Sequence, residues 1–263
     1  MGLDIRDSFL YLLSNQLKMK AVILAAGDGG RLGMEIPKVL LKIGNEYILD
    51  YHIKGLKKIG IEEVVIITGF KSELIEAHIT EHNLRNIINI KLVNNDKHDE
   101  LENGYSVLCS KEAVDSSFLM MMGDHLVDYD SLAPLIKSEP SKFTAIIDSD
   151  PQHTSVEQAT KVALENGLLK ESSKKLETFD ALDTGFFIVP PAVFAVLEEN
   201  KEQGKTEWND CVQRFIASGI KTFDIRSSFW LGINTPKELE NAKRKLAYIP
   251  KVKMNYPYAT VIK

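Results

Sequence analysis

The stretch AVILAAGDGGRLGMEIPK, residues 21–38, decides how the rest of the chain is interpreted. It opens on the apolar run 21–25, which is typical of a strand buried on both faces. Three glycines follow between positions 27 and 30 and let a ligand approach the main chain closely. Arg31 and Lys38 then supply two cations. Because backbone amides and cations together bind phosphates, the stretch predicts a nucleotide site.

Two other phosphate loops fit this stretch poorly. The dinucleotide fingerprint G-x-G-x-x-G needs a third glycine where Leu32 stands, and Gly33 comes one position late. The P-loop pattern G-x-x-x-x-G-K-[ST] does not fit at all. An NAD-dependent oxidoreductase is therefore the least favoured alternative. Glycine content alone would also suit a tight strand-to-helix turn with no ligand, but the strand context and the cations favour a nucleotide.

The pattern L-A-A-G-x-G-x-R-L-G, followed by P-K, resembles the signature of the sugar- and alcohol-phosphate nucleotidyltransferases. Members of this family usually carry Thr or Ser where Gly30 stands, so one hydroxyl contact to the phosphates is missing here. The resemblance runs from about residue 19 to residue 246. It implies a GT-A-like α/β fold, in which a Rossmann-like, mainly parallel sheet has helices on both faces and a small antiparallel part binds the acceptor.

The residue patterns agree with such a fold. Apolar strands are predicted to alternate with helices in the first half, which indicates right-handed crossovers and a parallel sheet. The strands are expected at 21–25, 63–68, 87–93 and 117–122, and the helices at 47–59, 72–82 and 103–111, the last capped by Asn103. The second half adds strands at 143–147, 160–164, 168–170, 185–189 and 220–225, a hairpin turn at 165–167, and helices at 190–199, 207–218 and 236–246.

We predict a single nucleotidyltransferase domain over residues 19–248. Residues 1–18 form an N-terminal extension whose apolar spacing predicts an amphipathic helix, packed on the domain or on a partner in a homodimer. Residues 249–263 form a C-terminal tail.

The composition of the chain argues against several classes of function. The 263 residues are 44% hydrophobic and carry a net charge of −5, which argues against a general nucleic-acid or anionic-membrane surface. No apolar run approaches the roughly 20 residues that span a bilayer. The two cysteines, Cys109 and Cys211, lie far apart in sequence, so we expect free thiols in a reduced, cytoplasmic protein.

Two motifs are candidates for binding Mg²⁺. Asp124 in MGDH follows an apolar strand, and a carboxylate there suits a hard cation, although Asp also caps helices and turns. The resemblance makes Asp124 the main metal ligand. It also predicts W-x-D-[IV]-[DN]-T-P where this chain has WLGINTP, residues 230–236. Gly232 replaces the first Asp, and Asn234 is the expected second metal ligand or, alternatively, only part of a helix start.

The remaining site residues are assigned by role. The loop 94–106 is expected to read the base. The candidates are Arg31, Lys38 and Asp124 for catalysis; Leu24, Ala26, Gly27, Gly29, Gly30, Arg31, Lys38, Asn103 and Ser106 for the nucleotide; and Lys161, Lys174, Asp183, Thr184 and Gly185 for the acceptor.

The order of these segments is most similar to that of the inositol-1-phosphate cytidylyltransferases. The resemblance implies that Mg²⁺, CTP and inositol-1-phosphate give CDP-inositol and pyrophosphate, and that a membrane-bound synthase takes the product. Alternatives are transfer to phosphocholine or a sugar-1-phosphate, and a non-catalytic nucleotide-binding homologue, which the glycines at 30 and 232 would favour.

One motif has no place in this function. Residues 78–82 read HITEH, which matches the zinc motif H-x-x-E-H. Two histidines four residues apart on a helix can share a metal, but the sequence shows no further ligand cluster nearby. We therefore predict an ordinary solvated helix face.

Overall fold

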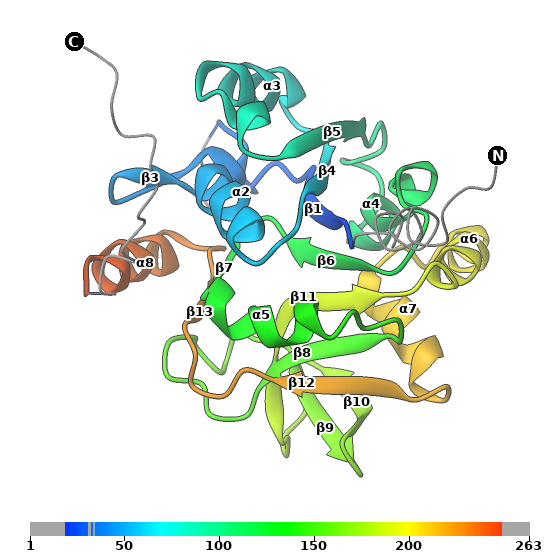
Figure 1. Cartoon of the computed structure of the whole chain (residues 1–263). Helices are drawn as coiled ribbons and strands as arrows, with labels where there is room; N and C mark the ends of the chain where they lie inside the picture. The colour runs from blue at the N-terminus through cyan, green and yellow to red at the C-terminus, as the bar shows by residue number, and fades with distance from the viewer. Residues whose placement is uncertain (1–18, 31–32, 34, 249–263) are drawn as a thin grey trace, which may run out of the picture.

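The computed structural model describes residues 19–30, 33 and 35–248 (Figure 1). The predicted amphipathic helix over 1–18 and the tail over 249–263 lie outside the described residues, and so does Arg31.

Within these residues, nine strands form one twisted sheet. Their order across the sheet is β5 (Asn89–Asn94), β4 (Glu63–Thr68), β1 (Ala21–Ala25), β6 (Phe118–Met122), β11 (Ala181–Val189), β8 (Thr144–Asp148), β12 (Ile220–Asp224), β10 (Leu168–Ser173) and β9 (Lys161–Glu165). The first four are mutually parallel. Strand β11 runs antiparallel to both of its neighbours, β6 and β8, and β10 runs antiparallel to β12 and β9. The expected antiparallel part therefore extends the same sheet.

Helices cover both faces of the sheet, as the alternating pattern predicted. Along β1, Ile23 packs into one hydrophobic layer and Val22 into the opposite one. The first layer includes α2 (Ile48–Lys58), α3 (Ser72–Glu81) and α5 (Tyr129–Lys137). The second includes α4 (Asn103–Cys109), α6 (Val193–Glu202) and α7 (Trp208–Ile216).

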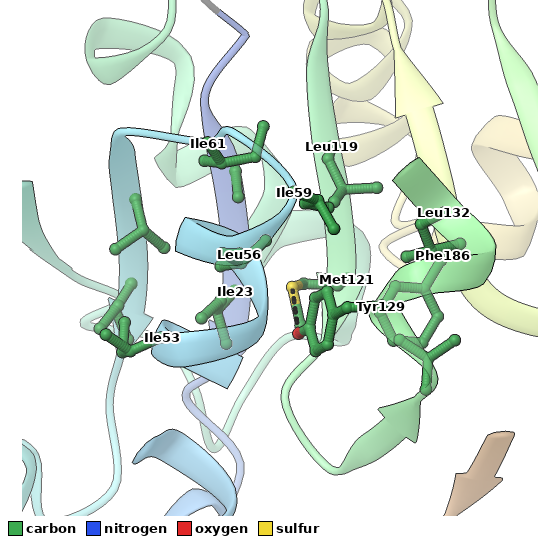
Figure 2. Close-up of a cluster of buried hydrophobic side chains, with 14 of the residues drawn as sticks. Ile23, Ile53, Leu56, Ile59, Ile61, Leu119, Met121, Tyr129, Leu132 and Phe186 are labelled. Carbon is green, nitrogen blue, oxygen red and sulfur yellow. Dashed lines mark hydrogen bonds between the residues drawn. The ribbon is translucent and has the colours of Figure 1, made fainter. Parts of the chain in front are cut away.

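Figure 2 shows the first of these layers, where α2 and α5 meet the sheet. Leu56 of α2 and Leu132 of α5 are fully buried there. Phe186 of β11 lies in the same layer as Met121 of β6, so the parallel and antiparallel halves share one core. Fully burying one such side chain contributes about 1.5–3 kcal/mol to the stability of the fold. This continuous layer therefore holds in place the strand ends that carry the site residues.

A smaller hydrophobic cluster holds the C-terminal helix α8 (Pro236–Tyr248). It includes residues from two short antiparallel pairs, β2 (Lys42–Ile43) with β3 (Glu46–Tyr47), and β7 (His125–Val127) with β13 (Trp230–Gly232). The pairing of β7 with β13 carries the segment after Asp124 alongside the WLGINTP segment, although about 100 residues of chain separate them.

Several elements differ from the sequence expectations. Helix α5 was not predicted, because Pro134 lies inside it and Pro normally ends a helix. Glu102 rather than Asn103 precedes α4, and the Asn103 Oδ1 instead accepts from the Trp208 backbone N–H at 2.8 Å. The hairpin turn is confirmed: β9 and β10 are joined by Asn166 and Gly167, both with positive φ. Three 3-10 helices, η2 (Lys38–Leu40), η3 (Leu84–Asn86) and η4 (Lys111–Ala113), complete the described elements.

Candidate active site

The site candidates gather at the carboxyl-terminal edge of the parallel strands. In the register of β1, Leu24 pairs with Met122 of β6, and Ala25 pairs with Thr68 of β4. The glycine loop after β1 and the Gly123-Asp124 turn after β6 therefore leave the sheet side by side. The Gly123 backbone N–H donates to the Leu24 carbonyl at 3.0 Å and ties the two segments together. Ligands of open α/β sheets bind at this edge.

Three predicted residues meet there. The Lys38 Nζ lies 2.6 Å from Asp124 Oδ2 and 3.0 Å from Asn234 Oδ1. The side chains of Lys38 and Asp124 are about one-sixth exposed, so the cluster reaches the surface without being fully solvated. The Lys38 side chain passes beneath Gly29, where a Cβ would lie 2.9 Å from the Lys38 Cγ. The glycine loop thus lies against the charged cluster.

Asp124 is ionised in this cluster. Burial alone would raise the pKa of its carboxyl, but the charges of His125 and Lys38 and the hydrogen bond from Lys38 outweigh burial and hold the pKa below its usual value. The backbone carbonyl of Asp124 accepts from the Ile233 N–H at 3.0 Å. A carboxylate and an amide oxygen that share one cationic partner form an oxygen donor set, which a hard divalent cation such as Mg²⁺ prefers. The residues present therefore fit the expected metal, and Asp124 and Asn234 would hold it.

Hydrogen bonds at both ends position the segment that carries Asn234. The fully buried carboxylate of Asp148, at the end of β8, accepts from the Trp230 indole N–H at 2.7 Å. At the other end of the segment, Glu238 Oε2 accepts from the Asn234 backbone N–H at 2.8 Å, and Thr235 Oγ1 accepts from the Glu238 N–H at 3.2 Å. Thr235 thus caps the start of α8, and Glu238 holds the residue before the cap. The segment is a helix start, as the alternative held, and it also directs the Asn234 side chain to Lys38.

His125 is a site residue that the sequence reasoning missed. Its imidazole lies between two glycines: a Cβ at Gly185 would meet Nδ1 at 2.2 Å, and one at Gly232 would meet Nε2 at 2.6 Å. Its Nδ1 donates to the Thr184 carbonyl at 2.9 Å, and its Nε2 lies 3.9 Å from Asp124 Oδ1. The only sequence signal was its place beside Asp124, because the two glycines that make room for the ring are distant in the chain.

The same geometry explains Gly232, where the resemblance led us to expect Asp. The imidazole of His125 occupies the space that a side chain at 232 would need. We expect Gly232→Asp to lower turnover about tenfold by displacing His125, and the double variant Gly232→Asp/His125→Ala to recover part of that loss, since residues in contact couple by roughly 0.5–3 kcal/mol. Steady-state rates of the two single variants and the double variant measure this coupling. Strictly additive losses would contradict it.

Five of the nucleotide candidates lie at or just after the carboxyl end of β1. Leu24, Ala26, Gly27, Gly29 and Gly30 lie at the end of β1 and in the loop after it, as expected, whereas Arg31 is outside the described residues. The Gly30 backbone N–H donates to the Asp28 side chain at 2.9 Å.

The expected base-reading loop packs beside the same strand ends. Ser106 is buried, and its hydroxyl accepts from the Asn95 amide at 3.0 Å. The Asn103 amide nitrogen lies 3.9 Å from the Met122 sulfur at the end of β6, and its oxygen is bonded to Trp208. Within the described chain, His98 Nδ1 in this loop is a buried ring nitrogen without a hydrogen-bond partner. The sequence reasoning did not select His98.

The acceptor candidates lie on and around β9, β10 and β11. The Lys161 ammonium of β9 lies 5.6 Å from the centroid of the Phe179 ring, and Lys174 lies in the exposed turn after β10. Thr184 is fully buried and its hydroxyl donates to the Ile146 carbonyl at 2.7 Å, so this hydroxyl faces the core. Its carbonyl accepts from His125, which connects the segment 183–185 to Asp124.

Asp183 has an unusual carboxyl. Removal from water raises its pKa to about 7, against a weaker opposing effect of the Gly185 N–H bond at 2.8 Å. Because the folded-state pKa is raised, the stabilising contribution of neutral Asp183 is present below pH 4 and is lost as the pH rises towards 7. We expect Asp183→Asn to gain stability relative to wild type over this range, by roughly 1–3 kcal/mol. Urea unfolding from pH 4 to 8 measures the gain. The exposed control Asp99→Asn should show none, and a pH-independent difference for Asp183→Asn would contradict the expectation.

A buried histidine holds the Gly123-Asp124 turn in place by hydrogen bonding. His52 of α2 is fully buried; its Nε2 donates to the Gly123 carbonyl at 3.0 Å, and its Nδ1 lies 2.7 Å from the Tyr129 hydroxyl. Burial lowers the pKa of His52 to about 4, so the ring is neutral at pH 7. Because the Nε2–H group of His52 donates to the Gly123 carbonyl, the unprotonated Nδ1 of His52 accepts from the Tyr129 hydroxyl.

The prediction of a solvated face for the HITEH helix is wrong for His78. This residue is only 8% exposed and bonds to Asp50 of the neighbouring helix α2. The sequence spacing could not show this contact, because Asp50 lies 28 residues earlier in the chain.

Comparisons with known proteins identify the family of this chain. A sequence model described as "Nucleotidyl transferase" matches residues 20–248. A bifunctional IPC transferase and DIPP synthase of Aquifex aeolicus is 34% identical over 231 residues, which cover 86% of this chain and 51% of the relative. A protein of the same description from Archaeoglobus fulgidus is 28% identical over 245 residues, covering 93% and 47%. The chain thus spans about half the length of these curated relatives.

Solved structures show the same fold. The structure described as the inositol-1-phosphate CTP transferase from T. maritima superposes with a TM-score of 0.75 at 23% identity, and the match covers 87% of this chain and 97% of the other. The GT-A-like α/β fold expected from the sequence is confirmed. Among the helices of the described residues, none combines the length and apolar composition needed to cross a bilayer.

Proposed function

This chain belongs to the nucleotidyl transferase family, and from that premise we propose that it transfers the cytidylyl group of CTP to inositol-1-phosphate. The products would be CDP-inositol and pyrophosphate. The names of the relatives and of the similar solved structure support this substrate pair.

One observation carries the proposal of catalysis. Lys38, Asp124 and Asn234 come from three distant parts of the chain, yet their charged and amide groups meet within 3.0 Å, beside a glycine loop at the carboxyl ends of parallel strands. This is an arrangement of cation and oxygen ligands beside exposed backbone, which suits a triphosphate. Such an arrangement favours a nucleotidyltransferase over the alternative of a protein that only binds nucleotides.

The reaction needs alignment and charge neutralisation rather than a general base. An oxygen of the acceptor phosphate, already ionised at neutral pH, attacks the α-phosphorus of CTP. The new P–O bond forms as the bond between the α-phosphorus and its bridging oxygen breaks, and pyrophosphate leaves with the electron pair. Lys38 lies against the glycine loop, where it would neutralise the triphosphate and the charge that develops on the leaving group.

The other residues are proposed to hold the reactants. A divalent cation bound by Asp124 and Asn234 would supply further charge neutralisation on the nucleotide phosphates. His125 and Lys38 together lower the pKa of the Asp124 carboxyl, and His125 connects Asp124 to segment 183–185, which we propose as part of the acceptor site. Asn103, Ser106 and His98 are proposed to read the base, and Lys161 and Lys174 to attract the acceptor phosphate.

A competition experiment tests the substrate pair. The enzyme is incubated with Mg²⁺, equal amounts of CTP, UTP, dTTP, ATP and GTP, and equal amounts of inositol-1-phosphate, phosphocholine and glucose-1-phosphate. Mass spectrometry then identifies the nucleotide conjugates. We expect CDP-inositol as the dominant product. A dominant UDP- or dTDP-glucose or CDP-choline signal would overturn the substrate pair while leaving the mechanism intact.

A further inference from the structure

A side-chain cluster outside the catalytic site brings three potential metal ligands together. His78 lies in the last turn of α3, His82 is the cap residue one turn later at the end of this helix, and Asp50 reaches both from α2. The His78 Nε2 lies 2.6 Å from Asp50 Oδ1, and the His82 Nδ1 lies 2.7 Å from Asp50 Oδ2. The imidazole rings are stacked with centroids 3.9 Å apart. One ligand atom from each of the three residues therefore lies within 4.8 Å of the other two.

The burial of the cluster suits a metal that enters from one side. Asp50 and His78 are 6% and 8% exposed, whereas the His82 side chain is 32% exposed. The Tyr47 ring packs edge-on against both imidazoles, with centroid distances of 4.6 Å and 5.0 Å. The cluster is thus buried at Asp50 and His78, contacts the aromatic ring of Tyr47, and is exposed to solvent at His82.

The donor chemistry selects the class of metal. Two imidazole nitrogens and a carboxylate oxygen are ligands that Zn²⁺ and related transition metals accept, with a fourth position left for water. Mg²⁺ prefers oxygen ligands alone, so this cluster differs in kind from the Asp124 and Asn234 pair. Zn²⁺ at about 2.0 Å from each ligand separates tetrahedral donor atoms by roughly 3.3 Å. Asp50 would need to part from each of the two histidine nitrogens by less than about 1 Å from its hydrogen-bonded distances of 2.6 and 2.7 Å, while those two nitrogens lie within 4.8 Å of each other.

We propose that Asp50, His78 and His82 form a site for one Zn²⁺-like divalent ion, which joins α2 to the C-terminal end of α3. The pKa of Asp50 supports an ionised carboxylate: burial would raise it, but hydrogen bonds from both histidines lower it overall. Metal binding replaces these hydrogen bonds with metal–ligand bonds. The N–H protons that face Asp50 move to the other ring nitrogens or to solvent, since ligating atoms must be deprotonated.

Zinc titration of the full chain tests the site without any activity assay. The protein is stripped with EDTA, dialysed, and titrated with Zn²⁺ by calorimetry in excess Mg²⁺, which occupies oxygen-only sites. The variants are His82→Gln, which alters the exposed ligand, and His153→Gln, a matched control whose histidine lies outside the cluster. We expect one Zn²⁺ per chain for wild type and the control, and a loss of affinity of roughly 100-fold for His82→Gln.

A second measurement keeps the test valid if a variant folds poorly. The thermal midpoint of each protein is measured in EDTA and with Zn²⁺ at 100 times the measured Kd, which should shift the folding equilibrium of wild type about 100-fold. His82→Gln should match wild type in EDTA within a few degrees and fail to respond to Zn²⁺. Equal zinc binding by wild type and His82→Gln would overturn the proposal, and so would no binding by wild type at 0.1 mM Zn²⁺, a concentration of roughly 100 times a micromolar Kd.

Discussion

Asp124→Ala should lose at least about 1,000-fold in turnover while keeping the fold. The variant removes the carboxylate that pairs with Lys38 and that we propose to hold the divalent cation on the nucleotide phosphates. Losing a metal's charge stabilisation costs several kcal/mol of transition-state free energy, and each 1.4 kcal/mol is a factor of ten in rate. Steady-state pyrophosphate release measures the loss.

The fold of this variant should survive, because the Asp124 backbone carbonyl still accepts from Ile233. Asp128→Asn is the matched control. Asp128 lies four residues further on and caps α5, and Asn serves equally well as an N-cap. We expect the control to retain near-normal turnover. Near-normal turnover by Asp124→Ala would remove Asp124 from the mechanism.

Lys38→Met should lower kcat/KM by roughly 100- to 1,000-fold, the loss typical of removing one donor that stabilises transition-state charge. The Met side chain keeps most of the packing beneath Gly29 but lacks the ammonium that bonds Asp124 and Asn234. Single-turnover rates at saturating CTP separate slower chemistry from weaker nucleotide binding.

The control for this variant is Lys42→Met, on the neighbouring strand β2, where the side chain is exposed. If Lys38 and Asp124 act as one unit, the double variant Lys38→Met/Asp124→Ala should be little worse than Asp124→Ala alone. Losses that multiply fully would show that the two side chains act independently.

Local patterns predicted much of the fold. The buried runs at 21–25 and 63–68 are confirmed as strands of the parallel part of the sheet, and the Asn166-Gly167 turn is confirmed as well, because strand and turn formation depend largely on nearby residues. The pairing of β7 with β13 and the burial of Asp148 against Trp230 could not be predicted, because such contacts join segments more than 80 residues apart.

In the candidate site, too, some residues could be predicted from the sequence and others could not. Lys38, Asp124 and Asn234 could be selected from motifs, and the structure brings them together. His125 could not, because its role depends on the space left by two glycines on other strands. The contact between Asp50 and His78 could not be predicted either. The spacing of residues on α3 does not show which side chain of α2 lies against them.

Pyrophosphate release from CTP and inositol-1-phosphate, with and without Mg²⁺, tests the central claim most directly. We predict rapid release only when enzyme, Mg²⁺, CTP and inositol-1-phosphate are all present, with one pyrophosphate for each CDP-inositol formed. Binding of CTP without release, for this acceptor and for phosphocholine and glucose-1-phosphate alike, would contradict it and identify a nucleotide-binding protein without transferase activity.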